Sequence, residues 1–492
     1  VGGTWFWNRY PGARCDIESL EYSYGFDADL QREWRWSERF APQPEILRYL
    51  QHVADRFGLL KDIQFNATVQ RAELVGAARW EVETSDGAIR RSQFVIMALG
   101  CLSATNMPNI AGLGAFAGRR FHTGRWPAGG VDVAGRRVAV VGTGSSGVQA
   151  IPCLADEASE LYVFQRTAGY VVPARNAPLS AEHEADVKAR YAAFRQEAKS
   201  TSNGHHPGSL GIGRASAMAV SESERRHEYE RRWIHGGVSF LNAFADLATD
   251  AQANATASDF VRSKIREIVL DPQTAELLCP KYIIGGKRLC VGTNYYETFN
   301  RPHVTLVDTR EGIEEVTPSG IKVGGREYHV DDIVFATGYD AMTGSILRID
   351  VRGRGGLRLC DKWSSGPLTY LGLAVAGFPN MFVVTGPGSP SVLTNMPPSI
   401  EHHVEWIASC LAHVRALGAR AVEADEEAES AWSEHVQEAA GGFLRAGVDS
   451  WYLGANVQGK PRVFMPYMGG FAFYVRQAED VAARGYEGFA CR

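Results

Sequence analysis

A glycine-rich turn in the first third of the chain is the clearest candidate for chemistry. Gly142, Gly144 and Gly147 occupy the glycine positions of a G-x-G-x-x-G pattern. They follow an apolar run, 137–141, and open a segment with helical patterning, which is the context of a dinucleotide site. There the second glycine lets the backbone approach a pyrophosphate, and the helix N-terminus supplies N–H groups and a positive dipole. Pro152 predicts that this helix kinks or ends early.

The next apolar run ends at Gln165-Arg166-Thr167. In dinucleotide-binding folds an acidic residue about 20 residues beyond the glycines holds the ribose 2′-hydroxyl of NAD. Arg166 instead suits a 2′-phosphate, through a charge-assisted contact. The sequence therefore favours NADPH over NADH, with a solvated strand-end charge as the alternative.

Two further segments have residue types that could serve a site. Lys287 and Arg288 follow a glycine pair, although a basic pair on a loop is usually only solvated charge. Residues 2–16 are dense in glycine and aromatic rings and include one acid, Asp16. That composition suits a loop wrapped on a flat heterocycle, and by itself it would equally suit a packed turn.

Three longer motifs identify a family. They are Phe116-x-Gly118-x-x-x-His122-x-x-x-Trp126-Pro127, then Asp332-x-x-x-Ala336-Thr337-Gly338-Tyr339, and the W-Y-x-G-A-N-x-x-G-K-P-R segment from Trp451 to Arg462. Together with residues 2–16 they resemble Baeyer-Villiger monooxygenases of the single-chain FAD and NADPH type, closest to the phenylacetone monooxygenase branch. The resemblance implies an enzyme that uses NADPH and O2 to convert a ketone into an ester or lactone through a C4a-peroxyflavin.

The resemblance also implies which residues touch the cofactors. The predicted FAD contacts are Gly3, Thr4, Trp5, Trp7, Asp16, Tyr22, Val69 and Met396. The predicted NADP contacts are Gly142, Thr143, Gly144, Ser145, Ser146, Gly147, Gln149, Arg166, Thr167, Lys287, Arg288 and Trp451. For Trp5 and Trp7, the alternative is a plain role as packed core aromatics.

The implied chemistry centres on Arg288. Its guanidinium is always charged and would stabilise the anionic oxygen during transfer to the ketone, while Asp16 holds it in place. Lys287 would contact an NADP phosphate, Trp451 the nicotinamide ribose, and Leu393 the ketone. Phe116, Gly118, His122 and Trp126 form the family fingerprint, and we expect structural roles for His122 and Trp126 in the link between nucleotide domains.

The family's first G-x-G-x-x-G, which binds the FAD pyrophosphate, should precede Val1. The sequence opens without Met and in the middle of a motif. We therefore expect an N-terminal truncation, and weak FAD binding by the chain as printed.

Alternating strand and helix patterns must position these residues. Runs at 137–141, 160–164, 333–336 and 381–385 predict buried strands, which indicates an α/β fold with two Rossmann-like domains. The predicted boundaries are an FAD domain at 1–101 and 340–492, an NADP domain at 102–173 and 281–339, and a helical insertion at 174–280. Within the insertion, segments 181–199, 222–233 and 257–270 have helical patterning.

Composition excludes several other classes. The chain has 492 residues and a net charge of -5, so it offers no basic surface for nucleic acid. Its eight cysteines include no C-x-x-C pair and no zinc spacing, which favours a reducing, cytoplasmic location and no metal. Apolar runs are too short to span a membrane. The sequence does not fix the oligomeric state, and a monomer is compatible with it.

Three alternatives share part of these features. A flavin N- or S-oxygenating monooxygenase has both Rossmann sites but needs no anionic peroxide, so the fingerprint and Arg288 argue against it. A disulfide reductase would need a C-x-x-C pair. A non-enzymatic, nucleotide-binding regulatory protein would fit if Arg288 and Asp16 were mere surface charges.

Overall fold

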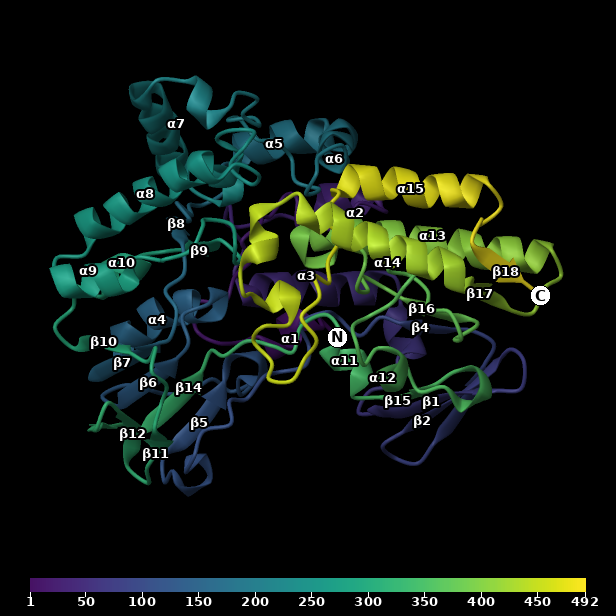
Figure 1. The fold of residues 1–492 in the computed structure, drawn as a ribbon, viewed down its shortest axis with the longest axis horizontal. Coiled ribbons are helices and arrows are strands. Elements are labelled where there is room, and N and C mark those ends of the chain that lie inside the picture. The colour runs from purple at the N-terminus through teal and green to yellow at the C-terminus, as the bar shows by residue number, and fades with distance from the viewer.

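A five-stranded parallel sheet forms the core of one lobe of the computed structural model, which describes residues 1–492 (Figure 1). Its strands lie in the order β10 (Val304–Asp308), β7 (Glu160–Gln165), β6 (Arg137–Val141), β14 (Asp332–Phe335) and β5 (Arg119–His122). Strands β6, β7 and β14 match the predicted runs. All four residues of β14 are buried, as is typical of a parallel strand covered on both faces.

The glycine turn connects β6 to α4 (Ser145–Glu157). The helix does not end at Pro152 as the sequence allowed, because it continues for five more residues. A proline inside a helix costs about 3 kcal/mol or more. Burial of Val148, Ile151 and Leu154, each at most 1% exposed, packs α4 against the sheet and offsets that cost.

Helices fill the segment between two short parallel strands, β8 (Val171–Pro173) and β9 (Cys290–Gly292). They are α5 (Ala181–Ala189), α6 (Tyr191–Lys199), α7 (Glu222–His235), α8 (Ala251–Ile268) and α9 (Pro272–Leu278), and α10 (Tyr295–Thr298) follows β9. The predicted helix at 181–199 is divided at Arg190, whose φ of -124° is not helical. A capping box of Ser221 and Glu224 starts α7.

The second lobe combines smaller sheets with long helices (Figure 1). Its strands are β1 (Val69–Val75), β2 (Arg79–Thr84), β3 (Ile89–Ser92) and β15 (Asp350–Arg352) in one sheet, β4 (Val95–Met97) with β16 (Met381–Val383), and β17 (Val422–Ala424) with β18 (Phe489–Cys491). Its helices are α1 (Thr4–Trp7), α2 (Ala28–Glu33), α3 (Gln43–Arg56), α11 (Gly344–Leu347), α12 (Leu359–Lys362), α13 (Met396–Ala416), α14 (Glu426–Gly441) and α15 (Phe471–Ala483). The first lobe also carries β11 (Glu315–Val316), β12 (Gly320–Val323) and β13 (Arg326–His329). No helix is long and apolar enough to span a bilayer.

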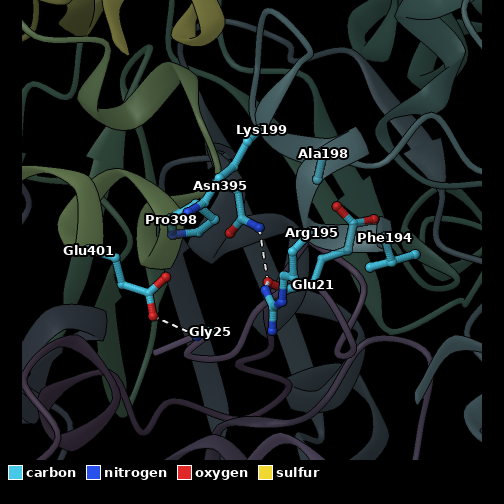
Figure 2. A pocket seen from close by; sticks show the side chains of 9 residues that line it. All are labelled: Glu21, Gly25, Phe194, Arg195, Ala198, Lys199, Asn395, Pro398 and Glu401. Atoms are coloured by element: carbon cyan, nitrogen blue, oxygen red, sulfur yellow. Dashed lines mark hydrogen bonds between the residues drawn. The ribbon is translucent and has the colours of Figure 1, made fainter. Parts of the chain in front are cut away.

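The start of α13 is anchored where three distant segments meet. The Asn395 side chain and Arg195 of α6 both donate to the carbonyl oxygen of Glu21, over 3.0 and 2.8 Å, and Glu401 accepts from the Gly25 N–H at 2.5 Å (Figure 2). The cavity between them is only about 50 Å³. That volume suits a water molecule or two rather than a cofactor, so this site fixes the helix that carries Met396.

A buried carboxylate, Asp332, stabilises the parallel sheet at the N-terminal end of β14. Asp332 is fully buried and accepts hydrogen bonds from Arg119 and Arg136, with Nε to oxygen distances of 2.6 Å in both cases. Burial opposes ionisation, but the hydrogen bonds from both guanidinium groups outweigh it and hold the pKa of Asp332 below its usual range. The ionised carboxylate therefore ties β5, β14 and the turn before β6 together.

We expect Asp332→Asn to lower the free energy of unfolding by about 1 to 3 kcal/mol, because two charge-assisted contacts are weakened while both arginines can still reach water. Denaturant unfolding at pH 7 measures the loss. Asp331→Asn is the matched control, since Asp331 pairs with Arg137 at a more exposed place. Equal stability of Asp332→Asn and the wild type would contradict this role.

Candidate active site

The three glycines of the turn after β6 meet three different surroundings. A Cβ on Gly142 would lie 2.6 Å from the carbonyl oxygen of Ala336, and one on Gly147 would lie 2.3 Å from that of Gly142. Gly142 also has a φ of 108°. A Cβ on Gly144 would meet nothing within 4 Å. The turn is thus closed where it packs on its own strands and open at the helix N-terminus, which fits a pyrophosphate.

Two cations lie close enough to influence each other's charge, one of them directly after β7. Arg166 and Thr167 are exposed, and Lys287 is half-buried. Burial lowers the pKa of Lys287, and the positive charge of nearby Arg166 acts in the same direction. Neither cation has a carboxylate within salt-bridge distance. The negative charge of Asp449 acts on Lys287 from a greater distance and in the opposite direction. Two cations without a bonded carboxylate, at the place where a ribose would lie, suit a phosphate dianion.

Arg288 and Asp16 form an ion pair between segments 272 residues apart. The Asp16 carboxylate accepts from Nη2 of Arg288 at 2.6 Å and from Nε at 3.2 Å. The side chains are 29% and 23% exposed, so the pair is only partly accessible to solvent. The negative charge of Asp16 raises the pKa of Arg288 further above its ordinary value. The guanidinium is therefore charged and oriented at any working pH.

A side-chain clamp brings Asp16 to this place. Tyr10 donates to the Gln149 side-chain oxygen at 2.8 Å, and the Gln149 amide donates to the carbonyl oxygen of Arg14 at 3.1 Å. A Cβ on Gly12 would lie only 2.3 Å from the backbone oxygen of Gln149, so only glycine allows this approach. The loop before Asp16 is therefore docked on α4, and Gln149 serves this contact with its side chain.

The segment from Trp451 to Arg462 contacts Tyr339 and Asp340, which follow the end of β14. Asn456 donates to the carbonyl oxygen of Tyr339 at 2.7 Å. Lys460 forms an ion pair with Asp340 at 2.6 Å. Trp451 itself joins an apolar cluster that includes Leu393 and Met396. The structure thus packs these three predicted site residues against one apolar cluster, although Trp451 is more than 50 residues from the segment that carries Leu393 and Met396.

The chain is similar to known proteins over nearly its whole length. The family described as "Flavin-binding monooxygenase-like" matches residues 35–198. A Baeyer-Villiger monooxygenase from Pseudooceanicola batsensis is 42% identical, over 99% of this chain and 89% of its own length. A phenazine N-monooxygenase from Lysobacter antibioticus is also 42% identical, over 99% and 90%. A solved structure of an oxidised steroid monooxygenase bound to NADP is 49% identical, with a TM-score of 0.94 over 100% of this chain and 92% of its own.

The chain belongs to the type I Baeyer-Villiger monooxygenases. Members of this family use NADPH and FAD, and the predicted α/β fold and both predicted cofactors are confirmed. In this Baeyer-Villiger monooxygenase, the open turn at Gly144 fits NADP. On the flavin side, Trp7 is 57% exposed and Phe6 37% exposed, on a segment held in place by hydrogen bonds from Trp5 to Tyr22 and from Gln43 to Trp5. An exposed aromatic ring such as Trp7, on a short helix that is fixed in place, fits a flat heterocycle.

Three of the four fingerprint residues of this Baeyer-Villiger monooxygenase are buried, and Gly118 is partly exposed. Phe116, His122 and Trp126 are each 6% exposed. The Nδ1 atom of His122 accepts from the Gly124 N–H at 3.0 Å. Burial lowers the pKa of His122 to about 4, so the imidazole is neutral and supports the loop. A Cβ on Gly118 would lie 2.3 Å from the carbonyl oxygen of Asp331, which explains the glycine.

Not every predicted cofactor contact of the monooxygenase lies in one place. Val69 is in β1, in a sheet that contains none of the other predicted FAD residues. Thr143 donates to the carbonyl oxygen of Thr167 at 3.2 Å, and Ser145 lies 3.5 Å from the sulfur of Cys290. Sequence reasoning missed Tyr10, Asn456 and Lys460 as supports of the site, although the last two lie within a motif that it had singled out.

Proposed function

We propose that Arg288, held by Asp16, stabilises the negative charge that develops on oxygen as this enzyme inserts one atom of O2 beside a ketone carbonyl. The observation that carries the proposal is the two-contact ion pair at 2.6 and 3.2 Å, which joins the segment of the predicted FAD contacts to the loop of Lys287 and stays partly exposed. A preorganised cation in such a place acts most strongly on the charge of the transition state.

The overall reaction converts a ketone, O2, NADPH and a proton into an ester or lactone, NADP⁺ and water. Bound FAD supplies the oxygen-activating chemistry and bound NADPH the reducing equivalents. We place the NADP pyrophosphate at Gly144, the 2′-phosphate between Arg166 and Lys287, and the nicotinamide side near Trp451. Trp5, Tyr22 and Met396 would lie along the flavin, and Leu393 would border the ketone.

We assign the domains as predicted, with FAD-binding residues 1–101 and 340–492, NADP-binding residues 102–173 and 281–339, and an insertion at 174–280. A cytoplasmic location is supported by eight free cysteines. We propose that the partners are a ketone and O2, and that aryl, cyclic and steroid ketones are the classes to test.

The two cations beyond β7 predict a coenzyme preference. We expect NADPH to exceed NADH in kcat/KM by about ten- to a hundredfold, because a charge-assisted phosphate contact is worth about 1.5 to 3 kcal/mol. Arg166→Ala should remove most of this preference by weakening NADPH use alone. Steady-state NADPH and NADH oxidation with a saturating ketone measures it. Equal efficiency of the wild type with both coenzymes would contradict the assignment.

One observation favours a second candidate function, oxygenation of a nitrogen atom. A relative with 42% identity is named a phenazine N-monooxygenase. Transfer to a nitrogen lone pair needs no charge stabilisation on a carbonyl oxygen, so it would leave Arg288 without the role proposed here. Product analysis with ketones and with phenazines separates the two functions.

A further inference from the structure

Arg445 is a second arginine beside the Arg288 loop, and the proposed function does not use it. It lies in a short 3-10 turn, η8 (Leu444–Gly447), between α14 and Trp451. A Cβ on Gly285 would lie 3.7 Å from its Nη2 atom, and its guanidinium carbon is 5.8 Å from the centre of the Tyr452 ring. Arg445 thus reaches the same loop that carries Lys287 and Arg288.

The turn that carries Arg445 is held firmly against this loop. The N–H of Leu444 donates to the carbonyl oxygen of Ala248 at 3.0 Å. A Cβ on Gly286 would lie only 2.8 Å from a methyl group of Val448, so the turn and the loop pack in close contact. The backbone position of Arg445 is therefore fixed by contacts on both sides of it.

The charge of Arg445 lacks a partner in the protein. Its side chain is half-buried and forms no ion pair and no hydrogen bond with another residue. Burial lowers the pKa of Arg445, and the positive charge of Arg288 acts in the same direction. Arginine nevertheless stays protonated in proteins. The only carboxylate bonded at this loop, Asp16, is already engaged by Arg288.

The anionic groups of NADPH are accounted for elsewhere in the proposed site. The pyrophosphate has the open helix terminus at Gly144, and the 2′-phosphate has Arg166 and Lys287. Arg445 instead stands over Tyr452, which belongs to the apolar cluster with Leu393, Met396 and Trp451. This is the side of the site where the ketone is expected.

We propose that Arg445 is an anion subsite for the substrate, and that the preferred ketones carry a carboxylate. The inference rests on the proposed function and names the substrate class of the same site. The guanidinium would bind the carboxylate with paired N–H donors while the apolar cluster takes the carbon skeleton, so that the carbonyl is presented to Arg288.

The test uses keto acids of increasing chain length and their primary amides as neutral partners, with the FAD-loaded enzyme. For the best acid, we expect wild-type kcat/KM to exceed that of its amide by about ten- to a hundredfold. Arg445→Gln should remove this preference through a higher KM for the acid, and should leave the KM of the amide and of NADPH within about threefold. Arg445→Lys should retain part of it. Arg484→Gln is the matched control, because Arg484 pairs with exposed Glu487.

The outcomes separate the inference from the function on which it rests. Neutral ketones converted to esters, without any preference for acids, would overturn the inference alone. A rise in the KM of NADPH in Arg445→Gln would overturn it too, since Arg445 would then serve a coenzyme phosphate. No ester from any ketone would overturn the proposed function. Unchanged thermal unfolding of Arg445→Gln ensures that the kinetic changes are not caused by misfolding.

Discussion

Replacing Arg288 with alanine abolishes ester formation and leaves the fold intact. The ion pair with Asp16 is partly exposed, and such pairs contribute only about 0 to 1 kcal/mol to stability. The same guanidinium faces charge that develops during oxygen transfer, and a preorganised donor of this kind is worth about 3 to 4 kcal/mol, a hundred- to a thousandfold in rate. Arg288→Ala should therefore keep the stability of the wild type while it loses ester formation.

The measurement is ester yield per NADPH consumed, with a ketone that the wild type accepts. NADPH oxidation can continue in Arg288→Ala as uncoupled release of hydrogen peroxide, or it can slow if Arg288 also positions the nicotinamide. Either result removes the ester. Arg39→Ala is a control for loss of a half-buried cation, since Arg39 pairs with Glu18 and neither residue belongs to the proposed site. A yield within about a factor of two of the wild type would remove Arg288 from the mechanism.

Replacing Gly144 with alanine weakens NADPH binding without disturbing the protein. The backbone at Gly144, with a φ of -79°, accepts any residue, and its Cβ would meet no protein atom. The added methyl group would, however, occupy the space that a pyrophosphate needs at the helix N-terminus. Losing one or more hydrogen bonds to a charged group should raise the dissociation constant of NADPH by about ten- to a hundredfold or more.

Two other glycines complete this test. Gly129 also has open space around its Cβ and ordinary dihedral angles, so Gly129→Ala should change neither stability nor NADPH affinity. Gly147→Ala should unfold at a lower temperature, because its Cβ would lie 2.3 Å from the oxygen of Gly142. Thermal unfolding and NADPH titration of the three variants give the answer. Normal NADPH affinity of Gly144→Ala would move the pyrophosphate away from this turn.

Local patterns predicted the parts of the fold that local forces decide. The β6 strand matched its predicted bounds, the β7 strand is one residue longer than predicted, and the β14 strand begins and ends one residue earlier than predicted. Continuous apolar runs and a glycine turn suffice for these elements. Pro152 was different, because propensity argued for an early end of α4 while buried neighbours keep the helix intact. At this place, the buried contacts of α4 outweigh the cost of a proline inside a helix.

The site was predictable only where a motif named its residues. The Arg288–Asp16 pair was expected from the family resemblance, and the structure places the two side chains in contact. The clamp of Tyr10 on Gln149 joins residues 139 positions apart, and neither side chain suggests the other in the sequence. Arg445 lies outside every motif, and its unpaired charge becomes visible only when the chain has brought it to Gly285.

The most direct test of the whole account is the product formed from isotopically labelled oxygen. The FAD-loaded protein is supplied with NADPH, ¹⁸O2 and, in parallel, ketones, a phenazine and a thioether. We expect esters or lactones in which each molecule contains one ¹⁸O atom, with one product molecule formed per NADPH oxidised. Ketones should be the preferred substrates. Labelled N-oxide or sulfoxide without any ester would contradict it.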